Sequence, residues 1–361
     1  MFSSLTSALG MGSSTGSGTG SGTGSGGRKL LLVFVHGFMG SQESFHSFPD
    51  HVRMGLGEYG VGNVATEQFE YKTSGDNAEA VSALVSFLMD RAAASKAGAP
   101  DVVLLGHSMG GPLSVDAVRQ LRQLAGAGAE LVRIRGVLSF DSPFFGLHPN
   151  VLLGTGVERA QDMASKASSA LSMLGRLAGT GGAASSAGTR AAATSSSSST
   201  AATGAKTGGA GGSSAWTMAL GAVAVAGAAY GAYTSSTVVK QTVDRAVSAG
   251  ADQAMSHAAF LGPLWRVGDQ TQRFVDVQSY APQVYFHGFF IELERGAGAG
   301  VRRFTQAGPA HLDALFGAHR MAAAADEIDA HMRMFDAAHD RAAYAALVAA
   351  ACSRVARGPR R

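Results

Sequence analysis

Cysteine and charged residues are scarce in this chain of 361 residues, which holds one cysteine and 15% charged residues. A single cysteine excludes an internal disulfide bond and any metal site built from several cysteines. We therefore expect Cys352, which lies in an Ala-rich helical stretch, to be a small buried apolar residue. A reducing compartment fits this composition but is not required by it.

Blocks of basic residues are also missing, although the net charge is +3. Basic residues cluster only in a short C-terminal tail, which holds Arg354, Arg357, Arg360 and Arg361. Without basic residues interleaved with aromatics, nucleic-acid binding is unsupported. No Lys or Arg precedes Arg28, so the start of the chain lacks the pattern of a secretory signal. We expect an intracellular protein, cytoplasmic or membrane-associated.

Large apolar side chains are rare in two segments, residues 1–28 and residues 164–215, which consist mainly of Ser, Gly, Thr and Ala. Such segments bury too little apolar surface to offset their backbone entropy, so we expect both to be mobile. Residues 216–260 open with an uncharged stretch, 216–233, that carries Gly227 and Gly231. This apolar segment is expected to be either a lid over a site or a membrane contact, and the sequence leaves both open.

The remaining residues, 29–163 and 261–357, have the pattern of one α/β domain that is interrupted by the low-complexity insertion. Short apolar runs alternate with amphipathic stretches, which indicates a doubly wound, mostly parallel sheet. The predicted strands are 28–35, 64–72, 101–105, 132–140, 283–291 and 302–305, and the predicted helices are 77–94, a helix that ends near 124, and 326–357.

The clearest motif is Gly106-His107-Ser108-Met109-Gly110, which directly follows the apolar run 101–105. A serine between a buried strand and a helix, with small residues two positions away on each side, is typical of a nucleophile elbow. The tight turn exposes the hydroxyl at the top of the sheet. Ser108 is therefore the candidate nucleophile.

A second motif, His36-Gly37-Phe38-Met39-Gly40, follows the first predicted strand. At this position the chain has to turn so that a backbone N–H faces the nucleophile. We expect the amides of Phe38 and Met109 to form an oxyanion hole. No phosphate-binding loop accompanies these motifs, since the Gly-rich start of the chain lacks the Lys-Ser/Thr ending, and the sequence implies no cofactor and no metal.

The two motifs, in this order and about 70 residues apart, resemble those of the α/β-hydrolase superfamily. Within it they are similar to the lipase and serine-esterase branch, in which HG-x-x-G and GHSMGG are typical. The stretches 140–148 and 327–335 are similar to a group of predicted fungal serine esterases. The resemblance covers roughly residues 29–150 and 280–340, and it implies the α/β-hydrolase fold with a Ser, acid, His triad in that chain order.

A histidine has to accept the proton of the serine. Four histidines follow the last predicted strand, namely His311, His319, His331 and His339. The resemblance favours His331, because Ala-His-x-x-Met-Phe is similar to the family context of the base.

The acid that holds the imidazole is harder to assign. The loop after the strand 283–291 offers Glu292 and Glu294 but no aspartate. Asp141 ends the strand 132–140, where some lipases place their acid and where catalytic groups converge, so it is the first choice. Asp313 is the fallback, whereas Asp326, Glu327 and Asp329 are expected to cap the helix that carries His331.

These residues predict a serine hydrolase that cleaves a carboxylic ester or thioester through an acyl-enzyme, with an apolar or lipid substrate. Acyl transfer would use the same residues. A different class is a non-catalytic α/β-hydrolase relative that serves as a membrane tether or interaction module. The sequence does not predict an oligomeric state.

Overall fold

In the part of the chain that the structure describes, six parallel strands form a central sheet in the order β2-β1-β3-β4-β5-β6. The computed structural model describes residues 28–95, 98–125, 131–149, 151, 260, 267–293 and 301–358. The expected low-complexity segments 1–28 and 164–215 and the apolar stretch 216–233 lie outside these residues, apart from Arg28. The strands are β1 (Leu30–Val35), β2 (Val64–Phe69), β3 (Asp101–His107), β4 (Arg133–Phe140), β5 (Tyr285–Leu293) and β6 (Phe316–Met321).

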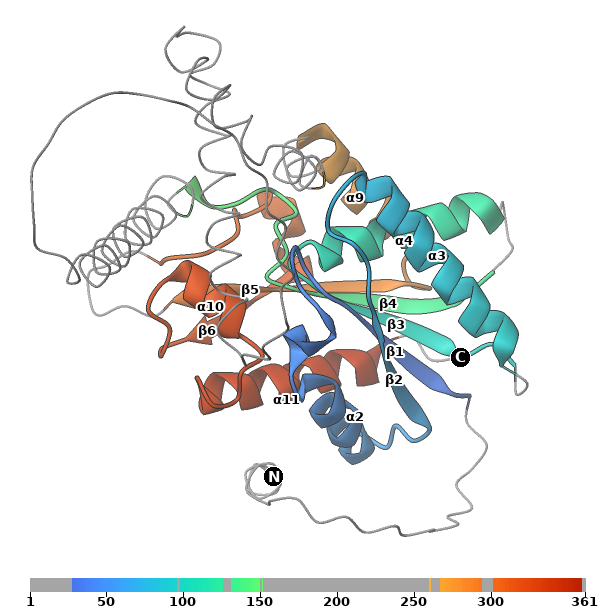
Figure 1. Ribbon diagram of the computed structural model, residues 1–361, viewed down its shortest axis with the longest axis horizontal. Helices are drawn as coiled ribbons and strands as arrows, with labels where there is room; N and C mark the ends of the chain where they lie inside the picture. The colour runs from blue at the N-terminus through green and yellow to red at the C-terminus, as the bar shows by residue number, and fades with distance from the viewer. Residues whose placement is uncertain are drawn as a thin grey trace, which may run out of the picture.

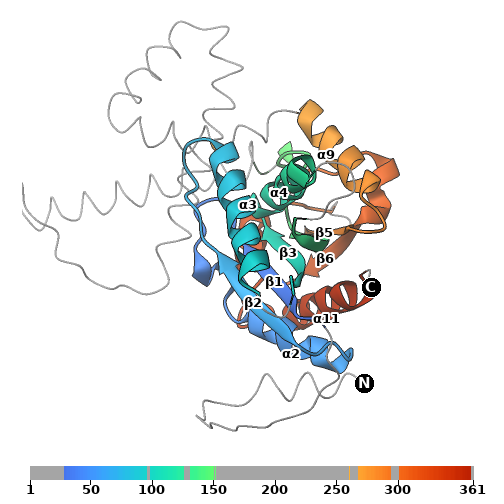
Figure 2. The same cartoon turned by 90° about the vertical axis from the view of Figure 1, so that its right-hand side faces the viewer.

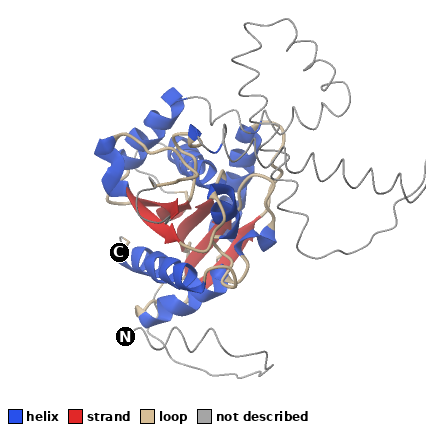
Figure 3. Cartoon of the chain, turned by 90° about the vertical axis from the view of Figure 1, so that its left-hand side faces the viewer, coloured by secondary structure: helices blue, strands red, loops and turns tan. Residues whose placement is uncertain are grey.

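Helices cover both faces of this sheet (Figures 1 and 2). They are α2 (Phe48–Glu58), α3 (Asn77–Ala94), α4 (Gly110–Ala125), α9 (Val267–Ser279), α10 (Glu327–Arg333) and α11 (Arg341–Arg357), with 3-10 turns η1 (Gln42–Phe45) and η4 (Ala310–Leu315). Helices α3, α4 and α9 lie over one face, and α2 and α11 lie over the other, so the strands are sandwiched between helical layers (Figure 3). Helix α10 packs on β5.

The apolar runs of the sequence follow from this sandwich. In β1 the five residues Leu31–Val35 are buried, because helices cover both faces of a parallel sheet. Helix α3 has the predicted bounds and begins at the N-cap Asp76, whose side chain accepts a hydrogen bond from Ala78 N–H. The predicted doubly wound α/β sheet is confirmed.

The C-terminal part differs from the prediction. Residues 302–305 form no strand, and only isolated bridges occur there, at Arg302 and Thr305. The last strand in the described residues is β6, an edge strand whose sequence FGAHRM lacks β-branched residues. The predicted helix 326–357 is two helices, since Asp340 caps a new helix by accepting a hydrogen bond from Ala343 N–H.

Cys352 is buried as expected, and burial raises the pKa of its thiol to about 12. None of the helices in the described part of the chain is long and apolar enough to cross a membrane.

Candidate active site

Ser108 lies in a strained turn between β3 and α4. Its φ angle is +51°, in the left-handed region that a serine rarely adopts, and its backbone N–H donates to the Phe140 carbonyl at 2.9 Å. The turn is tight enough that a β-carbon on Gly110 would lie 2.1 Å from the Val35 carbonyl oxygen. This is the strand-turn-helix context that the sequence motif predicted.

The turn after β1 packs directly against Ser108. A β-carbon on Gly37 would lie 2.6 Å from the Ser108 β-carbon and 3.2 Å from its hydroxyl oxygen. The Gly37 carbonyl accepts hydrogen bonds from Gly40 N–H at 3.0 Å and from the His36 ring at 2.9 Å. Because a trans peptide is planar, the N–H of Phe38 points opposite to that carbonyl, away from the His36 ring.

His36 holds this turn from behind. Its Nδ1–H donates to the Gly37 carbonyl, and its Nε2 accepts from Tyr71 N–H at 3.3 Å. Both bonds form when Nδ1 carries the proton of a neutral ring, and burial lowers the pKa of His36. The Tyr71 ring stacks on the imidazole at 4.4 Å, and its hydroxyl donates to the His36 carbonyl at 2.7 Å. The sequence motif gave no signal for Tyr71.

Asp141 is fully buried directly after β4, with a φ angle of +45°. Its backbone N–H donates to the Phe289 carbonyl at 2.6 Å, and its Oδ1 accepts from Ile291 N–H at 3.1 Å. Two contacts to the neighbouring strand β5 therefore fix the carboxylate. Its second oxygen, Oδ2, accepts from Nδ1 of His331 at 2.6 Å.

His331 lies in α10 and is fully buried. One face of its imidazole stacks on Phe304 at 3.7 Å between ring centroids, with an interplanar angle of 17°. The ring of His107, the residue before Ser108, lies 4.6 Å away. Burial lowers the pKa of His107 well below its usual value. The structure thus brings together Asp141, His331 and the turn that carries Ser108.

The alternative histidines lie elsewhere. His311 is exposed in η4, and His339 follows α10 near Asp329. His319 is not beyond the last strand, as the sequence suggested, but within β6. It is buried, and within the described residues its Nε2 has no hydrogen-bond partner.

The alternative acids also have other contacts. Glu292 pairs with Arg303, and Glu294 lies outside the described residues. Asp326 caps α10 as predicted, accepting a hydrogen bond from Asp329 N–H at 2.8 Å. Glu327 instead forms a buried ion pair with Arg302, for which the sequence gave no signal.

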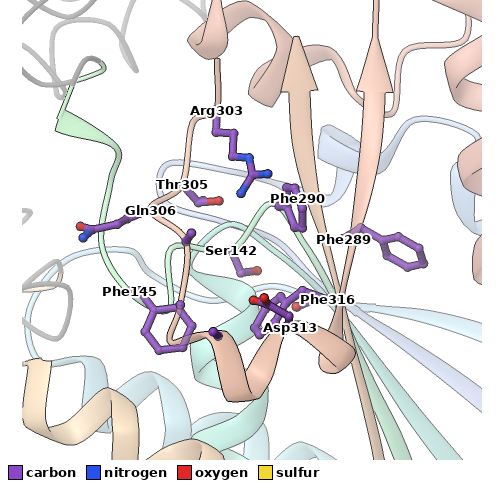
Figure 4. A pocket seen from close by; sticks show the side chains of 13 residues that line it. Ser142, Phe145, Phe289, Phe290, Arg303, Thr305, Gln306, Asp313 and Phe316 are labelled. Atoms are coloured by element: carbon purple, nitrogen blue, oxygen red, sulfur yellow. The ribbon is translucent and has the colours of Figure 1, made fainter. Parts of the chain in front are cut away.

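A pocket of about 400 Å³ borders the Asp141 side of the site (Figure 4). Its lining residues are Ser139, Ser142, Phe145, Phe289, Phe290, Arg303, Thr305, Gln306, Ala307, Gly308, Ala310, Asp313 and Phe316. Two lining residues are next in the chain to residues that contact His331: Ser142 follows Asp141, and Thr305 follows Phe304. The pocket therefore lies beside the His331 site. The fallback acid Asp313 belongs to this lining.

The family model described as "Putative serine esterase (DUF676)" matches residues 27–197, just under half of the chain. This match covers both glycine-rich motifs and Asp141. The chain has the α/β-hydrolase fold. The match agrees with the predicted resemblance to the serine-esterase branch.

Solved structures of lipases and esterases match at low identity. Phospholipase PlaB from Legionella pneumophila is 16% identical, with 35% of this chain and 27% of that chain covered and a TM-score of 0.28. Monoglyceride lipase from Saccharomyces cerevisiae is 17% identical, with 38% and 44% covered and a TM-score of 0.29. The lipase BlEst2 from Bacillus licheniformis is 19% identical, with 35% and 44% covered and a TM-score of 0.26. The chain therefore spans less than half the length of each. Among curated proteins, none matches the sequence.

Within the described residues, no group of three or more His, Cys, Asp and Glu side chains could hold a metal ion.

Proposed function

We propose that this α/β-hydrolase cleaves a carboxylic ester or thioester with Ser108 as nucleophile, His331 as base and Asp141 as acid. The observation that carries the proposal is the buried hydrogen bond of 2.6 Å between His331 Nδ1 and Asp141 Oδ2, next to a serine in a strained turn. A buried carboxylate on Nδ1 leaves Nε2 as the imidazole nitrogen that accepts the serine proton.

The reaction then proceeds in two halves. Ser108 Oγ forms a bond to the substrate carbonyl carbon while His331 takes the hydroxyl proton, and the resulting imidazolium is stabilised by Asp141. The bond to the leaving alcohol or thiol breaks as His331 returns the proton to it. Water, deprotonated by the same imidazole, attacks the acyl-enzyme, releases the carboxylic acid and restores Ser108.

The amides of Phe38 and Met109 are proposed to hold the oxyanion. Two observations support Phe38: the peptide before it contacts Ser108, and the bonds from His36 and Gly40 to the Gly37 carbonyl turn the Phe38 N–H away from His36. Met109 follows the nucleophile directly, at the position that supplies the other donor in nucleophile elbows.

The pocket beside Asp141 is proposed to receive one arm of the ester. The side chains of Phe145, Phe290 and Phe316 supply its apolar surface, and Ser142, Arg303 and Asp313 add polar groups (Figure 4). Its volume suits a short or medium-length group, while a longer lipid chain would require further surface. The expected lid or membrane contact at 216–233, outside the described residues, stays a proposal for that role.

A fluorophosphonate probe tests the proposed function. It should label the full-length protein at Ser108, and labelling should disappear in Ser108→Ala and fall strongly in His331→Ala. A folded wild-type protein that stays unlabelled, with and without liposomes, would contradict the esterase proposal and favour a non-catalytic tether or interaction module. A labelled protein would next be tested with p-nitrophenyl esters of increasing acyl length. An added alcohol that diverts the acyl group from water would indicate acyl transfer.

A further inference from the structure

A short strap, residues 301–306, crosses the site at His331. Leu293 N–H donates to the Arg302 carbonyl at 3.0 Å, which ties the strap to the end of β5. His148 N–H donates to the Phe304 carbonyl at 2.9 Å. Gln306 N–H donates to the Gly146 carbonyl at 3.0 Å, so the other end of the strap is tied to the segment that follows Asp141.

Side chains of the strap hold the segment that carries His331. Arg302 donates through Nε and Nη2 to both carboxylate oxygens of Glu327, and the Glu327 side chain is 1% exposed. Glu327 lies in α10, one helical turn before His331, so the two side chains project from the same face of the helix. A two-pronged guanidinium bond fixes orientation as well as distance.

Phe304, two residues after Arg302 in the strap, covers the imidazole of His331. Phe304 is fully buried, and its ring lies nearly parallel to that of His331 at 3.7 Å. The face of a phenyl ring carries partial negative charge and attracts a cation placed over it. His331 is cationic in the proposed mechanism only after it has taken the serine proton, so this attraction favours the transition state over the resting state.

We infer that the strap is a positioning element for the proposed base, in which the Arg302–Glu327 pair sets the place of α10 and the Phe304 ring stabilises the imidazolium of His331. The inference rests on the proposed function. Arg303 adds a link from the strap to the pocket, because it pairs with Glu292 and lies 4.3 Å over the Phe290 ring (Figure 4). One segment thus contacts both the base and the pocket that we assign to the substrate.

The sharpest test replaces Phe304 with pentafluorophenylalanine, which keeps the shape of the ring and reverses the sign of charge on its face. We expect kcat for a p-nitrophenyl ester to fall by about fivefold with KM unchanged. The acid limb of the pH–rate profile should move to lower pH by about 0.7 pH unit, because the imidazolium is less stabilised. A purely structural role for the ring would leave the acid limb in place.

Two further variants complete the test. Phe304→Tyr keeps an electron-rich ring and should retain the wild-type acid limb. The same fluorinated residue at Phe34, which is buried in β1 with its ring against Phe45 and Phe48, should change neither kcat nor the limb. Arg302→Lys keeps the charge but loses the fork, and should lower kcat by about threefold with the acid limb unmoved.

The result that overturns the inference is an unchanged kcat and acid limb in the fluorinated Phe304 protein. Labelling of the wild type at Ser108 separates this failure from failure of the proposed function, since the probe reports the nucleophile whether or not Phe304 matters. If the wild type is unlabelled, both proposals fall. If it is labelled and the fluorinated protein behaves like it, only the role of the strap falls.

Discussion

The turn that carries Ser108 and the segment that carries His331 are held by different kinds of contact. Around Ser108 the contacts are made by backbone atoms at close range, with Gly110 against the Val35 carbonyl and Ser108 N–H bonded to Phe140. Around His331 they are made by side chains, namely the carboxylate of Asp141, the ring of Phe304 and the ion pair of Arg302 with Glu327.

Because the contacts differ, different kinds of substitution should damage the two regions. The serine turn depends on the absence of side-chain atoms, so an added methyl group is the damaging substitution there. The histidine region depends on charge and shape, so there an isosteric change of charge is the damaging one. Asp141 joins the two, because it ends the strand next to β3 and binds the imidazole.

The largest expected effect comes from breaking that junction with Asp141→Asn. Asparagine tolerates the positive φ angle and keeps the acceptor for Ile291 N–H, but it presents an NH₂ group to His331 Nδ1. The imidazole then carries its proton on Nε2 and cannot accept one from Ser108. We expect kcat on a p-nitrophenyl ester to fall by about 10³- to 10⁴-fold with the fold intact by circular dichroism.

Asp90→Asn is the matched control, because Asp90 is an exposed carboxylate in α3 and does not line the pocket. Its kcat should stay within about threefold of wild type. An equal loss in both variants would mean that the acid has been misassigned.

The difference between local backbone contacts and long-range side-chain contacts also explains which features could be predicted from the sequence. Around Ser108 and Gly37 the motif states the local geometry, so the strand, turn and helix could be predicted from neighbouring residues. The parallel sheet with helices on both faces could also be predicted, from the alternation of apolar runs and amphipathic stretches. The strap 301–306 has no such local code: its aromatic and basic residues resemble a strand, whereas contacts with α10 and with residues 146–148 hold it as a loop.

Strand β6 could not be predicted either, because its local sequence also gives a misleading signal. This edge strand pairs only with β5, and Gly317 and Ala318 have low preference for strands. His331 could be favoured through family context, but its bond to Asp141 depends on contacts 190 residues apart in the chain, which no local pattern reports.

A smaller effect sharpens the serine side of the comparison. Gly37→Ala places a methyl group 2.6 Å from the Ser108 β-carbon, so the turn that carries the Phe38 amide has to move. Losing one oxyanion donor lowers kcat by about 10²-fold. Gly57→Ala is the matched control, since a β-carbon there meets nothing within 4 Å, and its activity should equal wild type. A fully active Gly37→Ala protein would argue against Phe38 as an oxyanion donor.

The smallest expected effect concerns acid stability on the histidine side. Burial lowers the pKa of His319 to about 4, against the opposing charges of Asp141 and Asp340. The unfolded chain therefore binds a proton at His319 below about pH 6.5, while the folded chain does not until about pH 4. This histidine lowers the free energy of unfolding progressively as the pH falls from 6.5 to 4, by about 1.4 kcal/mol per pH unit at most, and has no such effect above 6.5.

Urea unfolding at pH 7 and pH 4.5 measures this contribution. His319→Leu should reduce the stability lost between the two pH values by about 2 kcal/mol relative to wild type. The exposed residue His311 provides the control, because His311→Leu should leave the pH dependence unchanged. If His319→Leu loses as much stability as wild type on acidification, the His319 ring is not buried in its neutral form, and the proposed contribution of His319 to acid destabilisation is wrong.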